Sequence, residues 1–416
     1  MHDTLLINLA LLDTGAGRLR AGQCVRIRGG LIVEVGEGLA GAGARVVDLG
    51  GRTLMPGLID CHVHICSDSM TATPAIFPAL QAARSGRILR ETLMRGFTTV
   101  RDAGGADFGY VQAVEDGLFE GPRLFVSGRP ISQTGGHIDL RNPADPWPSC
   151  SCSEASTLRV VADGVDAVRR ACREELRRGA HAIKIMASGG ISSPADPIDH
   201  VQFSTAEIEA AVDEATRAKR YVLAHAYTDE AIARAVTAGV RSIEHGNFIE
   251  DDTARLMAAR GAFLVPTLVV YRRIVAHGRE VGVSELHLEK AREVLATGTR
   301  SLEIAHRAGV KMAFGTDLFR APKQYQAEEL LIRAEVLPAA DVLRSATLTS
   351  AELLGMAGRL GRVAPGHFAD VLAVDGDPLA DLGLLQEQGR HIALIMKGGV
   401  IHKSHVAGLE AAPTSR

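Results

Sequence analysis

LIDCHVH at residues 58–64 is a short apolar run that closes on two histidines one residue apart. Successive side chains of a β-strand alternate between two faces, so His62 and His64 would point to the same side. Two imidazoles on one side of a strand end form a ready-made metal chelate. Histidines at this spacing also occur by chance at a polar strand end, so a metal site needs support from other residues.

Seven further apolar runs follow this segment, and stretches with helical features separate them. Ser204 with Glu207 three residues later forms a capping box, which marks a helix start. A glycine stands just before five of the runs and suits a helix C-terminus. These glycines are Gly96, Gly179, Gly239, Gly261 and Gly309. A repeated strand and helix predicts a parallel sheet.

The predicted strands are 58–63, 98–102, 124–128, 182–186, 222–225, 242–245, 263–266 and 312–316. Eight parallel strands with helices between them, over about 260 residues, are typical of a (β/α)₈ TIM barrel. An open doubly wound sheet has the same repeat. The absence of Gly-x-Gly-x-x-Gly after the first strand weighs against that alternative.

Both ends of the chain are predicted to be β-structure. Residues 24–28 and 31–35 alternate around a Gly29-Gly30 turn, and residues 369–374 and 391–397 precede a second glycine pair. Such glycine pairs suit tight hairpins. We therefore expect residues 1–56 and 362–416 to form a small β-sandwich domain, with residues 57–361 forming the barrel.

The composition limits the possible partners and location. The chain has 416 residues, 46% of them hydrophobic, and its 46 basic and 49 acidic residues give a net charge of −3. The charged residues are mixed along the chain without a long block of one charge sign. Nucleic acid and anionic membranes are therefore not expected as partners. Without a signal sequence or a long apolar run, we expect a cytoplasmic protein. Its six cysteines are interpreted as reduced thiols, and Cys150 and Cys152 lack the second pair of a structural zinc site.

Polar residues at other strand ends support the metal site. His225 and His245 close the predicted fifth and sixth strands, and Asp317 closes the eighth. The catalytic rim of a barrel lies at these carboxyl ends. Four imidazoles meeting there without a cation would leave several ring nitrogens unsatisfied.

Lys184 lies inside the predicted strand 182–186, where alternation sends Ile183 and Ile185 outward and the lysine into the barrel. A buried ammonium is costly unless it is paired or neutral. One interpretation is a salt bridge to Asp317 or Glu244. The other is a neutral lysine that adds carbon dioxide and becomes a carbamate, whose two oxygens can bridge two cations.

Together these residues resemble the amidohydrolase superfamily, in the binuclear-metal branch that includes dihydroorotases, phosphotriesterases and many dipeptidases. The resemblance runs from MPGLIDCHVH at residues 55–64 to residues 366–370. It implies that His62, His64 and Asp317 hold the more buried metal and that His225 and His245 hold the more exposed one. Carboxylated Lys184 would bridge the two. Nitrogen and carboxylate ligands suit zinc, although manganese, cobalt or iron would also fit.

The metal pair implies amide hydrolysis. A metal-bound water whose pKa falls from 15.7 to about 7 supplies hydroxide at neutral pH, and this hydroxide would attack a carbonyl that the exposed metal polarises. Asp317 would take the proton and deliver it to the leaving nitrogen.

Three loops are similar to those of Xaa-Pro and Xaa-Arg/Lys dipeptidases, namely QTGGH at 133–137, ASGGISSP at 187–194 and AHAY at 224–227. In that group, residues like His137 and Tyr227 line the substrate pocket. His137 could donate to the developing oxyanion or be a loop histidine exposed to water. Tyr227 could reach the substrate or pack at the rim. Arg101 could bind a substrate carboxylate, but an ion pair with Asp102 is preferred.

The predicted substrates are small amides, such as an Xaa-Pro or Xaa-Arg/Lys dipeptide or an N-acyl amino acid. An imidazolonepropionase-like cyclic amidase or an aryl-amide (ochratoxin-type) amidohydrolase is the alternative with the same fold. A barrel that has lost catalysis and works as an interaction scaffold is a third possibility, and the complete ligand set argues against it. Relatives of this group often form symmetric homo-oligomers, so we expect one here.

Overall fold

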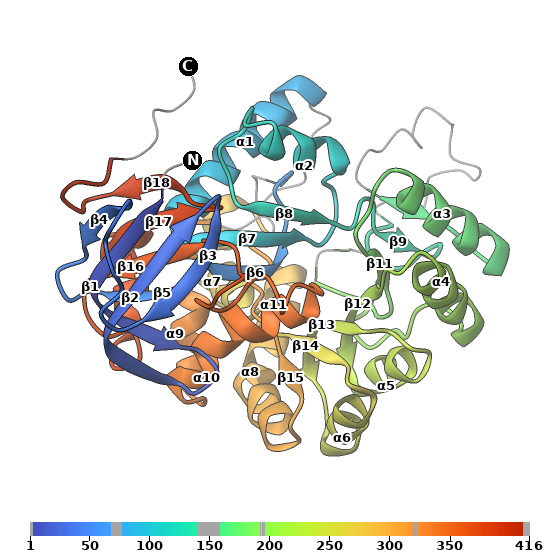
Figure 1. Cartoon of the computed structure of the whole chain (residues 1–416). Coiled ribbons are helices and arrows are strands. Elements are labelled where there is room, and N and C mark those ends of the chain that lie inside the picture. Colours follow the sequence, from blue (N-terminus) through green and yellow to red (C-terminus); the bar gives the residue numbers. More distant parts are fainter. Residues whose placement is uncertain are drawn as a thin grey trace.

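The structure is a computed structural model that describes residues 3–67, 77–139, 141, 159–191, 193, 196–318 and 323–410. Cys150 and Cys152 lie outside the described residues, as do Ser192 and Pro194 of the loop at 187–194. The described strands form three hydrogen-bonded sheets, and helices pack beside two of them (Figure 1). Within the described part of the chain, no helix has the length and apolar character needed to cross a membrane.

The two ends of the chain share one eight-stranded sheet, in which β5 from the N-terminal part pairs antiparallel with β16 from the C-terminal part. Its glycine turns carry positive φ angles, and the predicted hairpins are confirmed. The strands are β1 (Thr4–Asp13), β2 (Arg18–Arg28), β3 (Leu31–Gly36), β4 (Arg45–Asp48), β5 (Thr53–Pro56), β16 (Val371–Val374), β17 (Ile392–Lys397) and β18 (Val400–Ser404).

The middle of the chain forms a three-stranded and a seven-stranded sheet, both with parallel pairing. The first contains β6 (Leu58–Val63), β7 (Phe97–Asp102) and β8 (Arg123–Val126). The second contains β9 (Ile131–Ser132), β10 (Val160–Val161), β11 (Ile183–Met186), β12 (Val222–Thr228), β13 (Ser242–Phe248), β14 (Phe263–Val265) and β15 (Lys311–Met312). All eight predicted strands are present, and the two-residue strands β9 and β10 are additional.

Single backbone hydrogen bonds link the edges of these two sheets. The Cys61 amide donates to the Phe314 carbonyl at 2.7 Å, and the Asp317 amide donates to the His62 carbonyl at 2.8 Å. On the other side of the three-stranded sheet, the His181 amide, just before β11, donates to the Val126 carbonyl of β8 at 2.7 Å. The predicted strand at 312–316 is therefore paired with β6 by isolated bonds, and its regular part is short.

Helices alternate with the parallel strands as the sequence predicts. The capping box of Ser204 and Glu207 is present at the start of α4. The five glycines predicted at helix ends all have positive φ, which glycine adopts without strain. The α-helices are α1 (Pro78–Met94), α2 (Phe108–Glu115), α3 (Val165–Arg177), α4 (Thr205–Arg217), α5 (Asp229–Thr237), α6 (Asp251–Arg260), α7 (Leu268–His277), α8 (Glu285–Arg307), α9 (Glu328–Ala334), α10 (Ala339–Arg344) and α11 (Ser350–Leu353).

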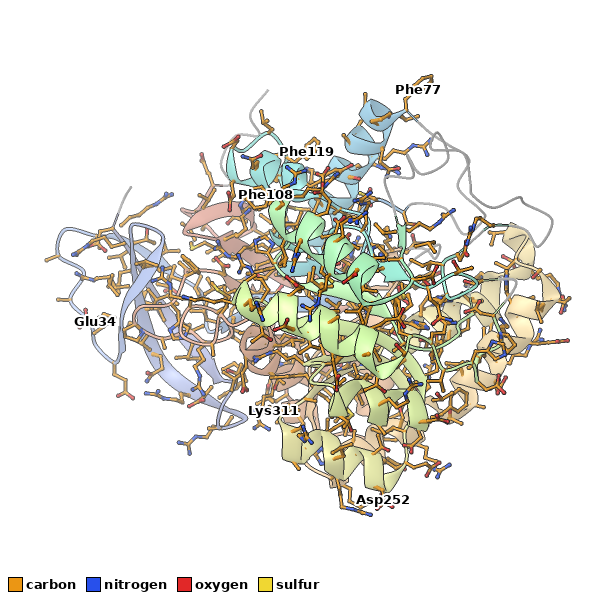
Figure 2. All side chains as sticks on the ribbon, turned by 90° about the vertical axis from the view of Figure 1, so that its right-hand side faces the viewer. Glu34, Phe77, Phe108, Phe119, Asp252 and Lys311 are labelled. Carbon is orange, nitrogen blue, oxygen red and sulfur yellow. The ribbon has the colours of Figure 1, made fainter. Side chains whose placement is uncertain are left out.

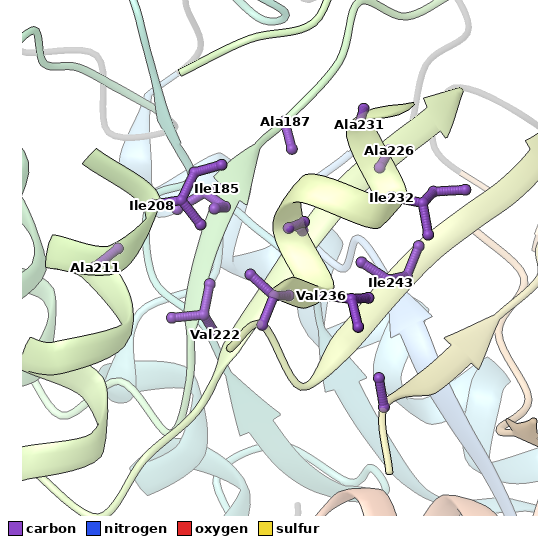
Figure 3. Close-up of a cluster of buried hydrophobic side chains, with 14 of the residues drawn as sticks. Ile185, Ala187, Ile208, Ala211, Val222, Ala226, Ala231, Ile232, Val236 and Ile243 are labelled. Atoms are coloured by element: carbon purple, nitrogen blue, oxygen red, sulfur yellow. The ribbon is translucent and has the colours of Figure 1, made fainter. Parts of the chain in front are cut away.

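Apolar side chains on one face of the parallel strands pack against these helices. Ile185 and Val222 lie beside Ile208 of α4, and Ile243 lies beside Ile232 of α5 (Figure 3). Side chains fill the space between sheets and helices, whereas Phe77 before α1 points outward and is 83% exposed (Figure 2). Because strand residues alternate, the residues between these isoleucines and valines face away from the helices.

Candidate metal centre

His62, His64 and Asp317 meet where β6 ends. Asp317 Oδ1 lies 3.6 Å from His62 Nε2 and 3.2 Å from His64 Nε2. One potential ligand atom from each of the three residues lies within 4.8 Å of the others. The two backbone bonds from residues 316 and 317 to the His62 carbonyl hold the carboxylate in this position. A divalent cation fits this set of two imidazoles and one carboxylate.

His225 and His245 continue the row of imidazoles. The ring centroids of His62 and His245 are 5.1 Å apart, and those of His245 and His225 are 4.7 Å apart. All three rings are buried, and His64 lies at the other end, 5.4 Å from His62. The four histidines predicted from separate strand ends are thus brought together by the fold.

Each of these four rings has one nitrogen occupied by a protein oxygen. A neutral imidazole carries one N–H and one lone pair, so a bond that uses the N–H leaves the other nitrogen to bind a metal. The pairs are His62 Nδ1 with Glu244 Oε2 at 2.7 Å, His64 Nδ1 with the Gly104 carbonyl at 2.8 Å, His225 Nε2 with the Gly189 carbonyl at 3.1 Å, and His245 Nδ1 with Thr267 Oγ1 at 2.7 Å. This pattern fixes the orientation of each ring and with it the direction of the nitrogen that would remain for a metal.

Burial favours the neutral form of His62, His225 and His245. It lowers the pKa of His62 and His225 well below the usual value, and it lowers the pKa of His245 to about 3. Burial also opposes protonation of His64, but the hydrogen bond and charge of Asp317 raise the pKa of that ring. Burial opposes the ionisation of Asp317, but the neighbouring His62 and His64 hold its pKa well below the usual range. Neutral imidazoles beside an ionised carboxylate are the protonation states that a metal site requires.

Two of the predicted ligands have unusual backbone conformations. The φ angle is +75° at His245 and +47° at Asp317. Residues other than glycine rarely adopt positive φ, and the strain costs about 1–3 kcal/mol each. Such strain concentrates at functional sites, because the surrounding structure must hold a side chain in one direction.

Lys184 is 2% exposed in β11, and burial lowers its pKa to about 8. Its charge lowers the pKa of His62, His225 and His245, so it lies within electrostatic reach of the histidines. Among the described residues, Asp317 pairs with histidines and Glu244 pairs with His62 and Arg101, and neither forms an ion pair with Lys184. The salt-bridge interpretation therefore lacks support.

The predicted ion pair between Arg101 and Asp102 is wrong. Adjacent strand residues point to opposite faces, and Arg101 turns toward Glu244, with Nη2 2.8 Å from both carboxylate oxygens. Asp102 instead accepts backbone N–H groups, including that of Ile65 at 2.8 Å. Since Arg101 is 1% exposed and its charge is matched by Glu244, it is not placed to bind a substrate carboxylate.

His137 packs against the histidine row and is not exposed to water. Its ring stacks on His225 with centroids 4.3 Å apart, and it is 6% exposed. Its Nδ1 lies 2.9 Å from Ser193 Oγ and 3.2 Å from Asp196 Oδ2. Gly190 is needed here, because a Cβ at this position would lie 2.3 Å from the His137 ring.

Tyr227 is also buried at the site. Its ring contacts His225 and His245, with centroids 4.8 Å and 5.1 Å away. Its hydroxyl donates to the hydroxyl of Tyr271 at 3.0 Å. The structure therefore places both predicted pocket residues against His225.

Sequence analysis missed four residues that orient this site. They are Glu244, which the sequence interpretation offers only as a partner of Lys184, and Asp196, Thr267 and Tyr271, which are outside the predicted set. Thr267 follows the seventh predicted strand directly, so its place at the rim was available as a signal. Tyr271 lies in α7 and belongs to no sequence pattern.

Glu244 offers a first test of this site. Replacing Glu244 with glutamine removes the charge that orients His62, and we expect the affinity for zinc to fall about 10- to 100-fold. Competition with a chromogenic chelator measures this affinity. Glu352→Gln is the matched control, because Glu352 pairs with Lys311 on the surface. Equal zinc affinity in both variants would contradict the orienting role of Glu244.

The parallel strands and the His-His-Asp cluster at their carboxyl ends define an α/β protein with a site suited to a divalent metal. The chain belongs to the amidohydrolase family, whose model matches residues 53–401. It is accordingly a hydrolytic enzyme.

Solved structures and curated proteins agree with this membership. An amidohydrolase structure is 50% identical, covers 98% of this chain and 100% of its own, and has a TM-score of 0.93. A prolidase structure in complex with N-methylphosphonate-L-proline is 46% identical, covers 97% and 100%, and also has a TM-score of 0.93. Ochratoxinase from Aspergillus niger is 33% identical over 376 residues, which are 84% of this chain and 75% of that protein.

Proposed function

We propose that this enzyme binds two divalent metal ions and hydrolyses the amide bond of a small substrate, such as an Xaa-Pro or Xaa-Arg/Lys dipeptide or an N-acyl amino acid. The observation that carries the proposal is the row of four imidazoles, three of them buried, with Asp317 at one end. The similarity to a prolidase supports a dipeptide-like substrate.

The donor set fits two metals. His62, His64 and Asp317 would hold one ion, and His225 with His245 would hold the other. Lys184, carboxylated by carbon dioxide, would bridge them, which is consistent with its burial and lowered pKa. When bound, two zinc ions supply a low-pKa water and polarise a carbonyl.

The residues around the metals have separate tasks. Asp317 accepts the proton of the attacking water and passes it to the leaving nitrogen, so one carboxylate acts as base and then as acid. His137 and Tyr227 line the substrate side and donate hydrogen bonds to the developing oxyanion. Their contacts with His225 support this position.

The proposal includes a closed (β/α)₈ barrel at residues 57–361 and a second domain from residues 1–56 and 362–416. The backbone hydrogen bonds at both edges of the parallel sheets favour closure. The shared sheet of β5 and β16 favours one domain built from both ends. A cytoplasmic location and a homo-oligomeric state are part of the same proposal, and sedimentation analysis measures the second.

A second candidate is an aryl amide of the ochratoxin type. The observation in its favour is the 33% identity to ochratoxinase over 84% of this chain. The same metals and the same Asp317 would hydrolyse either substrate. Only the side chains that line the substrate pocket would therefore distinguish an aryl amide from a dipeptide.

Metal content and a substrate screen test the proposal. Protein produced with zinc and bicarbonate is expected to carry close to two metals per chain, because six side chains are available as ligands. The screen compares alanyl-proline, alanyl-arginine, N-acetyl-phenylalanine and ochratoxin A, and N-methylphosphonate-L-proline serves as a binding probe. Elemental analysis that finds no metal would contradict the metal centre. Metal-loaded protein that cleaves none of the four compounds would contradict the proposed substrate class.

A further inference from the structure

Thr267 and Tyr271 connect a proposed metal ligand to a residue of the substrate pocket. Thr267 follows β14, and Tyr271 lies four residues later in the first turn of α7, on the same side of the chain. Both side chains are fully buried, at 0% and 1% exposure. Buried hydroxyls need hydrogen-bond partners, and theirs lie at the site.

The polar groups of His245, Thr267, Tyr271 and Tyr227 form one continuous set of contacts. His245 Nδ1 lies 2.7 Å from Thr267 Oγ1 and 2.9 Å from the Tyr271 hydroxyl. The hydroxyls of Thr267 and Tyr271 are 3.2 Å apart. The Tyr271 hydroxyl accepts from Tyr227 at 3.0 Å.

The number of protons restricts how this set can be ordered. Each hydroxyl has a single proton to donate and can also accept. When His245 presents Nε2 to a metal, its Nδ1 carries a proton and donates to Thr267. Thr267 can then donate to Tyr271, and Tyr271 to Tyr227. In that order none of the described residues accepts the Tyr227 proton, which is left for a ligand.

We propose that Tyr271 is a positioning residue that makes the Tyr227 hydroxyl a donor to the oxyanion of the substrate. Without substrate, Tyr227 donates to Tyr271. When an oxyanion is present, both tyrosine hydroxyls rotate, Tyr271 donates to Tyr227, and Tyr227 donates to the oxyanion. This inference rests on the proposed amide hydrolysis.

The burial of both tyrosines favours this arrangement. Hydrogen bonds in a chain polarise one another, and the effect is larger in a buried, low-dielectric site. A positive metal on His245 would strengthen its N–H as a donor and favour the direction toward Tyr227.

A double-mutant cycle, measured with the best substrate of the screen, tests the hydrogen-bond chain from Tyr271 to Tyr227. Tyr227→Phe removes an oxyanion donor, and kcat should fall about 10²- to 10³-fold. Tyr271→Phe removes one supporting hydrogen bond, and kcat should fall about three- to tenfold with KM unchanged. In the Tyr227→Phe background, Tyr271→Phe should have no further effect, because the group it supports is absent. Multiplying effects, or an unchanged kcat in Tyr271→Phe, would overturn the inference.

Two controls separate this result from misfolding and from failure of the proposed function. Tyr110→Phe makes the same chemical change at a tyrosine that interacts with Ser85 and Cys66 and takes no part in the contacts from His245 to Tyr227, and it should leave kcat unchanged. Zinc content and thermal unfolding of each variant report on metal loading and folding. If no compound of the screen is cleaved, calorimetric binding of N-methylphosphonate-L-proline replaces kcat in the cycle. If Tyr271→Phe weakens binding only in protein that retains Tyr227, the result would support the hydrogen-bond chain even though the proposed substrate class had failed. Equal binding would overturn it.

Discussion

Replacing Lys184 with alanine is expected to lower kcat/KM by more than about a thousandfold, because the two-metal site that activates water would be lost. Without a bridging carbamate, His225 and His245 alone offer only two protein ligands to the more exposed metal. Zinc content should fall from close to two per chain to one or fewer. Elemental analysis and steady-state kinetics measure the two effects.

Lys184→Met is the matched variant for this experiment. Methionine fills a similar buried volume and has no amine, so it separates loss of the carbamate from creation of a cavity. Both variants should lose activity, and Lys184→Met should keep its thermal stability. Growth with ¹³C-bicarbonate should give a carbamate carbon signal in the wild-type protein only. Full activity in either variant would exclude a bridging role for Lys184.

Replacing Asp317 with asparagine is expected to lower kcat by about 10²- to 10⁴-fold, because proton transfer loses its acceptor and donor. Asparagine keeps the shape of the side chain but cannot take a proton from water. The loss should appear in kcat even when zinc is supplied in excess. Asp252→Asn changes a carboxylate on α6 whose side chain is 94% exposed and pairs with Arg255, and it should leave kcat unchanged. Activity of Asp317→Asn near that of the control would contradict the assigned role.

The strand ends were predictable because they follow a simple repeat. Alternation within a strand put His62 and His64 on one side, and the same rule placed Lys184 away from Ile183 and Ile185, which pack against the helices. Since parallel strands share one carboxyl edge, residues from distant segments meet there. The histidine row follows from these two rules.

The contacts that orient the row were less accessible to sequence analysis. Arg101 was assigned to its neighbour Asp102, although strand alternation separates the two and Glu244 on β13 is the actual partner. A contact between β7 and β13 depends on how far apart the strands lie in space, which a sequence pattern does not give. The positive φ at His245 and Asp317 is likewise a product of tertiary packing, since local preference disfavours it.

The short regular part of the last predicted strand has a similar cause. Residues 314, 316 and 317 bond to β6 by single contacts as Asp317 turns toward the histidines. The carboxylate is thus positioned where regular strand pairing ends. An apolar run alone predicts a strand and gives no sign of this departure.

Anomalous diffraction at the zinc edge, from crystals grown with zinc and bicarbonate, tests the two-metal site most directly. The expected result is two peaks about 3.5–4 Å apart, one beside His62, His64 and Asp317 and one beside His225 and His245. Density for a carbamate on Lys184 should join them. A single peak, or two peaks with an unmodified Lys184 turned away from both, would contradict the bridged pair.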